Sequence, residues 1–205
     1  MDFLVQGPKT KPLATFLFAH GAGAPMDSDF MEEVSGGLAA QKIKVVRFEF
    51  PYMNTRRTTG KKMPPDRQNK CTDFWNEVLT QFPKGPLFIG GKSMGGRMAS
   101  LIFEQSRASG LIVFGFPFHA PGKLEFTKAE HLKSYSKPAI ILQGERDSMG
   151  SKAELKTKKF GTKVKIKYLD DGDHSLKPRK KSGLTFEDNL NTAVGLATEF
   201  IKTNL

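Results

Sequence analysis

The stretch that decides the fold is Leu87-Phe88-Ile89-Gly90-Gly91-Lys92-Ser93-Met94-Gly95-Gly96-Arg97. Its first residues are bulky and apolar, as in a buried parallel strand, and from Met94 onward apolar positions recur every three or four residues, as in a helix. Between the two patterns lies a G-x-S-x-G motif centred on Ser93. A strand that turns sharply into a helix lifts such a serine hydroxyl above the sheet. The stretch therefore predicts a nucleophile elbow, with Ser93 as the candidate nucleophile.

A plain glycine turn between a strand and a helix is the alternative interpretation, because short motifs of common residues also occur by chance. Gly95 and Gly96 favour the elbow. Each glycine inside a helix costs about 1 kcal/mol relative to alanine. Their presence at the start of this helix indicates that close packing of strand and helix requires them.

Length and composition favour one soluble domain. With 205 residues, the chain suits a single compact domain over residues 1–205. No apolar run approaches the roughly 20 residues of a membrane span, and the first twelve residues lack the pattern of a secretory signal. We therefore expect a cytoplasmic protein that does not bind a membrane. The single cysteine, Cys71, excludes an internal disulfide framework and a cysteine cluster for zinc.

The net charge of +11 would attract anionic substrates, nucleic acid or acidic protein surfaces. The cations gather in residues 56–62, 152–167 and 177–181. These clusters lack the aromatic interleaving and motif spacing of a nucleic-acid module. We therefore interpret them as solvated faces and expect no nucleic-acid partner; the sequence leaves the oligomeric state open.

Apolar runs of strand length alternate with helical patterns along the whole chain. The expected strands are 13–19, 43–48, 87–89, 111–116, 139–142 and 164–169, and the expected helices are 29–41, 72–82, 94–107, 153–160 and 186–202. This alternation predicts an α/β domain with a mostly parallel sheet and helices on both faces. In 164–169, lysines alternate with apolar residues, which is typical of a half-exposed edge strand.

Functional residues of open α/β sheets gather at the carboxyl ends of the strands. Ser93 follows the third expected strand, Asp147 the fifth and His174 the last. The order Ser, Asp, His is the chain order of a triad on the α/β-hydrolase sheet. These three residues are therefore the candidate catalytic group.

Four motifs together resemble those of a known family. They are Ala19-His20-Gly21-Ala22-Gly23-Ala24, Gly90-Gly91-Lys92-Ser93-Met94-Gly95-Gly96-Arg97, Gln143-Gly144-Glu145-Arg146-Asp147 and Gly172-Asp173-His174-Ser175-Leu176. The chain resembles small α/β-hydrolases of the dienelactone-hydrolase-like group, which includes a testis-expressed protein and a regulatory subunit of a histone-acetyltransferase complex. The resemblance covers nearly the whole chain and implies a single-domain α/β-hydrolase fold.

Each member of the candidate triad has a distinct expected role. Ser93 needs a neighbouring base, because a serine hydroxyl is a weak nucleophile at neutral pH, and His174 is that base. Asp147 would accept the second ring proton of His174 and stabilise the imidazolium. Glu145 and Asp173 are rival acids, and the resemblance favours Asp147.

The developing oxyanion needs two backbone N–H groups aimed at it. Met94 supplies one, since it directly follows the nucleophile. The resemblance assigns the second to Ala22, in the loop after the first strand, while Gly21 and Gly23 stay open as alternatives. A tight turn would also require these glycines.

The substrate side is less constrained. Arg56 and Arg57 lie in the segment 51–67 after a strand end, and if either faced Ser93 it would suit a carboxylate or phosphate on the substrate; a solvated loop is an equal alternative. His119 is expected beside the site, in a structural or pocket role and not in proton transfer. Lys92 and Arg97 could instead pin the structure through local ion pairs. No metal-ligand spacing such as H-E-x-x-H is present, so we expect neither metal nor cofactor.

A large cap domain is not expected, because residues 116–137 allow only a loop and one helix, over 125–135, before the next strand. The leading hypothesis is a serine hydrolase that cleaves a small ester, thioester or related carbonyl compound through an acyl-enzyme. The alternative is a non-catalytic scaffold of the same fold that binds an acidic partner.

Overall fold

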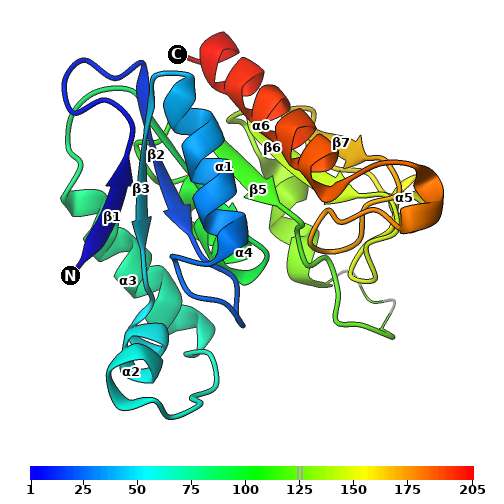
Figure 1. Ribbon diagram of the computed structural model, residues 1–205, viewed down its shortest axis with the longest axis horizontal. Coiled ribbons are helices and arrows are strands. Elements are labelled where there is room, and N and C mark those ends of the chain that lie inside the picture. Colours follow the sequence, from blue (N-terminus) through cyan, green and yellow to red (C-terminus); the bar gives the residue numbers. More distant parts are fainter. Residues whose placement is uncertain (124, 126) are drawn as a thin grey trace.

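The sheet is the frame of the molecule (Figure 1). The computed structural model describes residues 1–123, 125 and 127–205. Over these residues the strands are β1 (Phe3–Gln6), β2 (Ala14–Ala19), β3 (Ile43–Phe48), β4 (Leu87–Lys92), β5 (Gly110–Phe114), β6 (Ala139–Gly144) and β7 (Val164–Leu169). They form one seven-stranded sheet in the order β1-β3-β2-β4-β5-β6-β7, in which β1 alone runs antiparallel. The predicted α/β fold with a mostly parallel sheet is confirmed.

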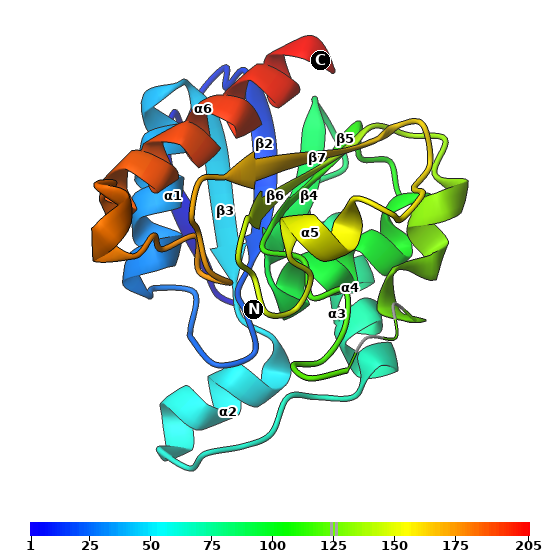
Figure 2. The ribbon, with the colours of Figure 1, turned by 90° about the vertical axis from the view of Figure 1, so that its right-hand side faces the viewer.

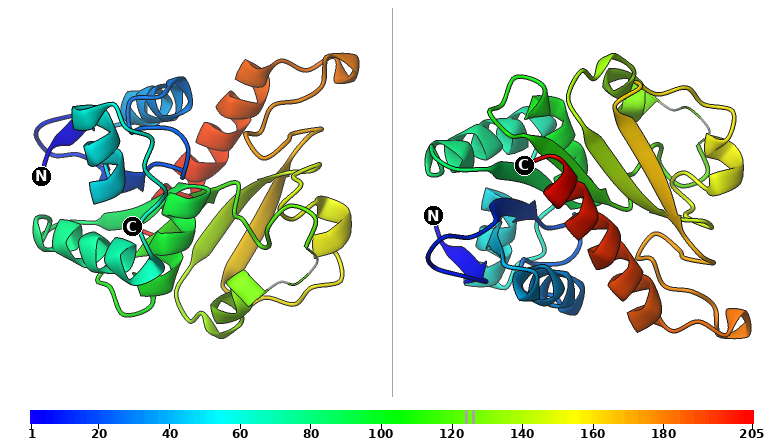
Figure 3. Two further views of the ribbon diagram at one scale, coloured as in Figure 1. Left: turned by 90° about the horizontal axis from the view of Figure 1, so that it is seen from below. Right: turned by 90° about the horizontal axis from the view of Figure 1, so that it is seen from above.

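Helices cover both faces of this sheet. α1 (Asp29–Ala40) and α6 (Phe186–Thr203) pack side by side on one face, and α3 (Gln68–Thr80) and α4 (Met94–Phe103) pack together on the other. Figures 2 and 3 show the twisted sheet between these two layers. α2 (Pro51–Thr59) and the short α5 (Lys152–Leu155) complete the α-helices, with 3-10 turns at Thr127–Ser134 and Lys180–Ser182.

The core lies in two layers because successive strand residues point to opposite faces. In β2, Phe16 and Phe18 pack under α1 and α6, whereas Leu17 and Ala19 pack under α3 and α4. All four are fully buried. Full burial of a large apolar side chain contributes about 1.5–3 kcal/mol, so the central strands hold the site rigidly at their carboxyl ends.

Two elements were not expected. β1 is a short antiparallel strand at one edge, and α2 replaces part of the loop expected over 51–67. α2 starts with proline at its first turn and stops at Gly60, which has a left-handed φ of 70°. Only Tyr52 and Met53 of this helix are buried, so its sequence shows little apolar periodicity.

Other boundaries differ for local reasons. β5 ends at Phe114 instead of residue 116, because Gly115 has a φ of 67°, which leaves the extended region. α5 begins at a capping box formed by Ser151 and Glu154 but lasts a single turn. The helix expected over 125–135 is a 3-10 helix at Thr127–Ser134, and residue 126 lies outside the described residues.

Two further expectations were correct. β7 lies at the edge of the sheet and exposes Lys165 and Lys167, as the alternating pattern predicted. Between β5 and β6, the described residues hold a loop and the one 3-10 helix, so no cap domain covers the sheet there. None of the described helices has both the length and the apolar character needed to cross a bilayer.

Candidate functional site

Ser93 lies on a sharp turn between β4 and α4. Its φ of 51° and ψ of −118° place a non-glycine residue in a sparsely populated region, at a cost of order 1–3 kcal/mol. The flanking glycines are needed for space: a Cβ at Gly91 would lie 2.5 Å from the Ala19 carbonyl oxygen, and one at Gly95 would lie 2.3 Å from the His20 carbonyl oxygen. The turn therefore has the crowded, strained geometry expected of the elbow.

Ser93, His174 and Asp147 form a continuous hydrogen-bonded chain. His174 Nε2 is 2.7 Å from Ser93 Oγ, and His174 Nδ1 is 2.8 Å from Asp147 Oδ2. Because a carboxylate oxygen accepts, the geometry favours the proton on Nδ1 and leaves Nε2 to accept from the serine hydroxyl. Asp147 is fully buried, whereas a quarter of the His174 side chain is exposed. The structure thus brings together the three residues that the chain order singled out.

Asp147 is held by two donors of its own. The Met149 N–H donates to Oδ1 at 2.8 Å, and the Gln143 amide donates to Oδ2 at 2.8 Å. Gln143 is also fully buried, and its Oε1 accepts from the Phe116 N–H at 2.8 Å. Gln143 stands in one of the four motifs, but the motif alone predicted no role for it. Its signal was a lone polar side chain in the otherwise apolar strand β6.

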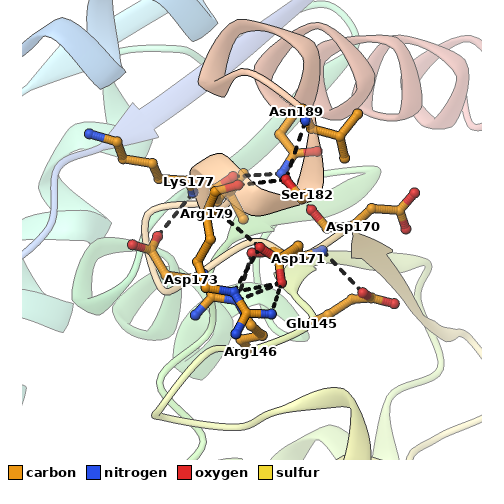
Figure 4. A network of polar contacts seen from close by, with 11 residues as sticks. Glu145, Arg146, Asp170, Asp171, Asp173, Lys177, Arg179, Ser182 and Asn189 are labelled. Carbon is orange, nitrogen blue, oxygen red and sulfur yellow. Dashed lines mark hydrogen bonds and ion pairs between the residues drawn. The ribbon is translucent and has the colours of Figure 1, made fainter.

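The rival acids have other partners (Figure 4). Glu145 accepts from Lys152 Nζ and, at 3.1 Å, from the Asp171 N–H. These bonds, that to Lys152 first, lower the pKa of the Glu145 carboxyl. Asp173 caps its own turn by accepting from the N–H groups of Ser175 and Lys177. Of the three candidate acids, Asp147 is the one that bonds to His174.

The loop that carries His174 is fixed from several sides. Asp171 pairs with Arg179 and Arg146, and these contacts, that to Arg179 first, hold the pKa of its carboxyl far below its usual range. Asn189 of α6 donates to the Leu176 carbonyl at 2.8 Å and to the Asp170 carbonyl at 3.0 Å. Figure 4 shows these residues converging on the segment between β7 and α6. The base is therefore presented by a braced loop.

His20 braces the loop after β2. Its Nδ1 donates to the Gly21 carbonyl at 2.6 Å, and its Nε2 accepts from the Phe50 N–H at 3.1 Å. Burial lowers the pKa of His20, so the ring stays neutral and can accept this bond. His20 therefore fastens the loop to the chain after β3.

The two candidate oxyanion donors belong to segments that adjoin Ser93. Met94 is the first residue of α4, where the N–H has no acceptor within the helix. On the other side, a Cβ at Gly21 would lie only 3.7 Å from Ser93 Cβ, so the loop with Ala22 lies against the serine. The Ala22 carbonyl accepts from the Tyr52 hydroxyl at 3.1 Å. This bond turns the carbonyl of Ala22 toward α2.

The two arginines of α2 bind the protein itself. Arg57 contacts Glu49 and Asp27 at 2.7 Å each, and these bonds, that to Glu49 first, raise its pKa. Arg56 donates to the Met63 carbonyl at 2.6 Å and stacks over the Tyr52 ring at 5.1 Å. Arg56 also donates to the Ala22 carbonyl at 3.4 Å, which places it at the loop beside Ser93. Neither arginine bonds to Ser93, and the substrate-binding roles of Arg56 and Arg57 stay predictions.

His119 also has protein partners. Its side chain is only 2% exposed, its Nδ1 donates to the Ala120 carbonyl at 2.9 Å, and its Nε2 is 3.7 Å from Glu154. Such burial indicates a structural role more than a substrate contact. Among the described residues, Lys92 and Arg97 bond to neutral oxygens and not to the carboxylates of local ion pairs. Lys92 Nζ donates to the His174 carbonyl, and Arg97 donates to the Gln68 side chain.

Comparison with known proteins places the chain in a structural class. Residues 12–202 match the model of a family described as an alpha/beta hydrolase domain. An esterase from Butyrivibrio proteoclasticus, solved with ferulic acid bound, superposes with a TM-score of 0.72 at 14% identity, covering 99% of this chain and 94% of that one.

Two further solved structures share the fold. An esterase domain from Rhodothermus marinus has a TM-score of 0.68 at 14% identity and covers 97% and 91% of the two chains. A serine hydrolase without a lid from Xanthomonas campestris has a TM-score of 0.66 at 17% identity, with 98% and 88% covered. At these identities the likeness is one of fold.

Proposed function

Because this chain belongs to the alpha/beta hydrolase family, we propose that it is a serine hydrolase that cleaves an ester, thioester or related carbonyl compound. The observation that carries the proposal is the hydrogen-bonded chain from Ser93 through His174 to Asp147, with links of 2.7 and 2.8 Å. A fully buried carboxylate that orients a histidine next to a strained, accessible serine fits nucleophilic catalysis.

The proposed reaction has two steps. Ser93 Oγ attacks the carbonyl carbon as His174 Nε2 takes the hydroxyl proton, and the Asp147 carboxylate stabilises the imidazolium. The bond from carbon to the leaving oxygen or sulfur then breaks, the leaving group takes the proton from His174, and an acyl-serine remains. Water repeats the sequence, giving the free acid and restoring Ser93.

The oxyanion would be bound by the N–H groups of Met94 and Ala22. Removal of one such donor costs about 3–4 kcal/mol of transition-state stabilisation in enzymes of this type. The assignment to Ala22 is supported by the bonds to the Gly21 carbonyl, from His20 Nδ1 at 2.6 Å and from the Tyr52 hydroxyl at 3.4 Å. The C=O and N–H of a trans peptide point in opposite directions, so these bonds fix the direction of the Ala22 N–H. Gly21 and Gly23 remain the alternatives.

The substrate class is proposed on a smaller basis. Similar folds include a structure with ferulic acid bound and a thioesterase domain from the curacin biosynthetic pathway. Absence of a cap between β5 and β6 in the described residues would leave Ser93 open to small acyl compounds. The finer resemblance to the dienelactone-hydrolase-like group fits this, and the net charge of +11 favours an anionic substrate.

A fluorophosphonate probe tests the proposal directly. We expect stoichiometric labelling of folded wild-type protein, with the modified peptide containing Ser93. Ser93→Ala should abolish labelling, and His174→Gln should slow it by at least a thousandfold, since the base is lost. A folded wild-type protein that is not labelled and hydrolyses no ester or thioester in a panel would refute the proposal. That result would favour the non-catalytic scaffold that binds an acidic partner.

A further inference from the structure

Lys92 links the nucleophile turn directly to the loop that carries the base. It is the last residue of β4 and immediately precedes Ser93. Its Nζ donates to the main-chain carbonyl of His174 at 2.6 Å. In the sheet, β5 and β6 separate β4 from β7, so no backbone pairing joins the two segments. The Lys92 side chain spans that separation, beside the bond of His174 Nε2 to Ser93 Oγ.

The surroundings of the Lys92 ammonium are closely fitted. Gly115 packs against it: a Cβ there would lie 2.9 Å from Lys92 Nζ and 2.6 Å from the His174 carbonyl oxygen. The Phe30 ring of α1 lies 5.6 Å from Nζ on another side. Any side chain larger than glycine at position 115 would therefore disturb the contact between Lys92 and His174.

The position is costly for a cation. No carboxylate forms an ion pair with Lys92 in the part of the chain that the structure describes. Burial lowers the pKa of Lys92 to about 8, although the more distant charges of Asp147 and Asp173 oppose this shift. An apolar residue at this half-buried position would avoid the penalty of desolvating a charge. Because desolvation of the Lys92 ammonium opposes folding, we infer that this lysine has a role other than stabilising the fold.

We propose that Lys92 is a positioning residue for the general base, which ties the His174 backbone to the elbow and so keeps the imidazole within bonding distance of Ser93. The inference rests on the proposed serine hydrolase function. The distance from His174 Nε2 to Ser93 Oγ depends on two loops at separate strands, and general-base catalysis is sensitive to shifts of a few tenths of an ångström to 1 Å. A charged donor also bonds a carbonyl more strongly than a neutral one.

The charge state of Lys92 gives the proposal a pH signature. The groups that face the ammonium are Asp147 after β6, Asp173 and His174 after β7, and Phe30 of α1. Above about pH 8 the ammonium loses its proton, and the remaining amine is a weaker donor. Reactivity of Ser93 should therefore decline above this pH in the wild-type protein.

The experiment compares Lys92→Met with Lys167→Met, which makes the same change on the exposed face of β7. The readout is the second-order rate of fluorophosphonate labelling between pH 6 and 10. At pH 7 we expect Lys92→Met to be at least tenfold slower than wild type and Lys167→Met to be within twofold of it. The decline above pH 8 should be absent from Lys92→Met, and Lys92→Gln, which keeps an N–H donor, should recover part of the rate.

Proton NMR provides a readout that needs no activity. The proton shared between His174 Nδ1 and Asp147 should give a low-field resonance that is missing in His174→Gln. In Lys92→Met we expect it to broaden or disappear while the melting temperature stays close to that of wild type. If Lys92→Met does not fold, Lys92→Gln and the wild-type pH series carry the same two readouts.

The outcomes separate the two proposals. Unchanged labelling and an unchanged resonance in folded Lys92→Met would overturn the positioning role. It would also be overturned if the labelling rates of wild type and Lys92→Met had the same dependence on pH. A wild-type protein that shows the resonance but no labelling would sink the hydrolase proposal, whereas loss of the resonance in Lys92→Met would still support the tether.

Discussion

Gln143→Glu is the sharpest test of how the site is supported, because it changes one donor into an acceptor without changing shape. Gln143 Nε2 lies 2.8 Å from Asp147 Oδ2, 3.1 Å from the Gly150 carbonyl and 3.2 Å from the Phe116 carbonyl. In the variant one carboxyl oxygen can still accept from the Phe116 N–H. The other faces three acceptors at a fully buried position.

The expected loss of stability follows from these contacts. A hydrogen bond to a charged group contributes about 1.5–3 kcal/mol, and one to a neutral carbonyl about 1 kcal/mol. The two carboxylates would also repel, so we expect a loss of about 4 kcal/mol in the free energy of unfolding at pH 8. For a domain of this size that corresponds to a fall of roughly 8–16 °C in melting temperature.

The deficit should shrink at lower pH. Two carboxylates that share a buried site raise the pKa of one of them above its unfolded value. The folded variant then binds more protons than the unfolded one, so its stability falls as pH rises. At pH 5 the protonated carboxyl that Gln143→Glu introduces regains one O–H donor toward Asp147. We therefore expect the loss in the free energy of unfolding at pH 5 to be about half of that at pH 8.

Urea unfolding, followed by the fluorescence of the single tryptophan, measures this. Trp75 is fully buried, so its signal should report loss of the core. Gln105→Glu, at an exposed position, is the matched control and should change stability by less than about 0.5 kcal/mol. A loss below about 1 kcal/mol at pH 8, or a larger loss at pH 5 than at pH 8, would refute the reasoning.

Two other predictions concern Gly95 in the elbow and His131, which lies in the 3-10 helix Thr127–Ser134 with its Nε2 2.8 Å from Ser100 Oγ of α4. Gly95→Ala places a Cβ 2.3 Å from the His20 carbonyl oxygen; we expect a loss of about 1–3 kcal/mol in stability and at least tenfold slower labelling. Gly36→Ala in α1, where no atom lies within 4 Å of the added Cβ, should leave labelling unchanged, and equal effects of the two substitutions would contradict the steric account. Burial, with a smaller effect of Arg97, lowers the pKa of His131 from 6.5 to about 4. The unfolded chain therefore takes up this proton first as pH falls, so the free energy of unfolding should drop between pH 6.5 and 4. Solvent screening at this partly exposed ring reduces the effect to about 1–2 kcal/mol. Urea unfolding of His131→Gln should show a flatter dependence over this range, and parallel curves for the two proteins would exclude His131 as the source.

Much of the fold followed from local patterns. The central strands and the long helices have apolar periodicities that depend on neighbours a few residues away, so their positions could be predicted within a few residues. The candidate triad followed too, because each member lies in a short motif directly after a strand. α2 and β1 did not, because a helix with two buried residues and a four-residue strand carry too little pattern.

The supporting contacts of Lys92 and Tyr52 could not be predicted, because their partners are distant in sequence. Lys92 contacts His174, and Tyr52 contacts Ala22. Which oxygen a polar side chain reaches is set by strand order and loop path, neither of which shows in local sequence. Arg57 illustrates the converse: its position after a strand suggested a ligand, but Glu49 and Asp27 neutralise it within the protein.

The bonds from Asn189 to the loop behind His174 have a consequence for synthesis of the protein. α6 follows His174 in the chain, and Asn189 donates to the carbonyls on both sides of that loop, at Asp170 and Leu176. In a nascent chain that has already formed the elbow, the loop that carries His174 still lacks these two bonds until α6 leaves the ribosome and docks. Ser93 should therefore reach its full reactivity only after α6 has folded onto the sheet.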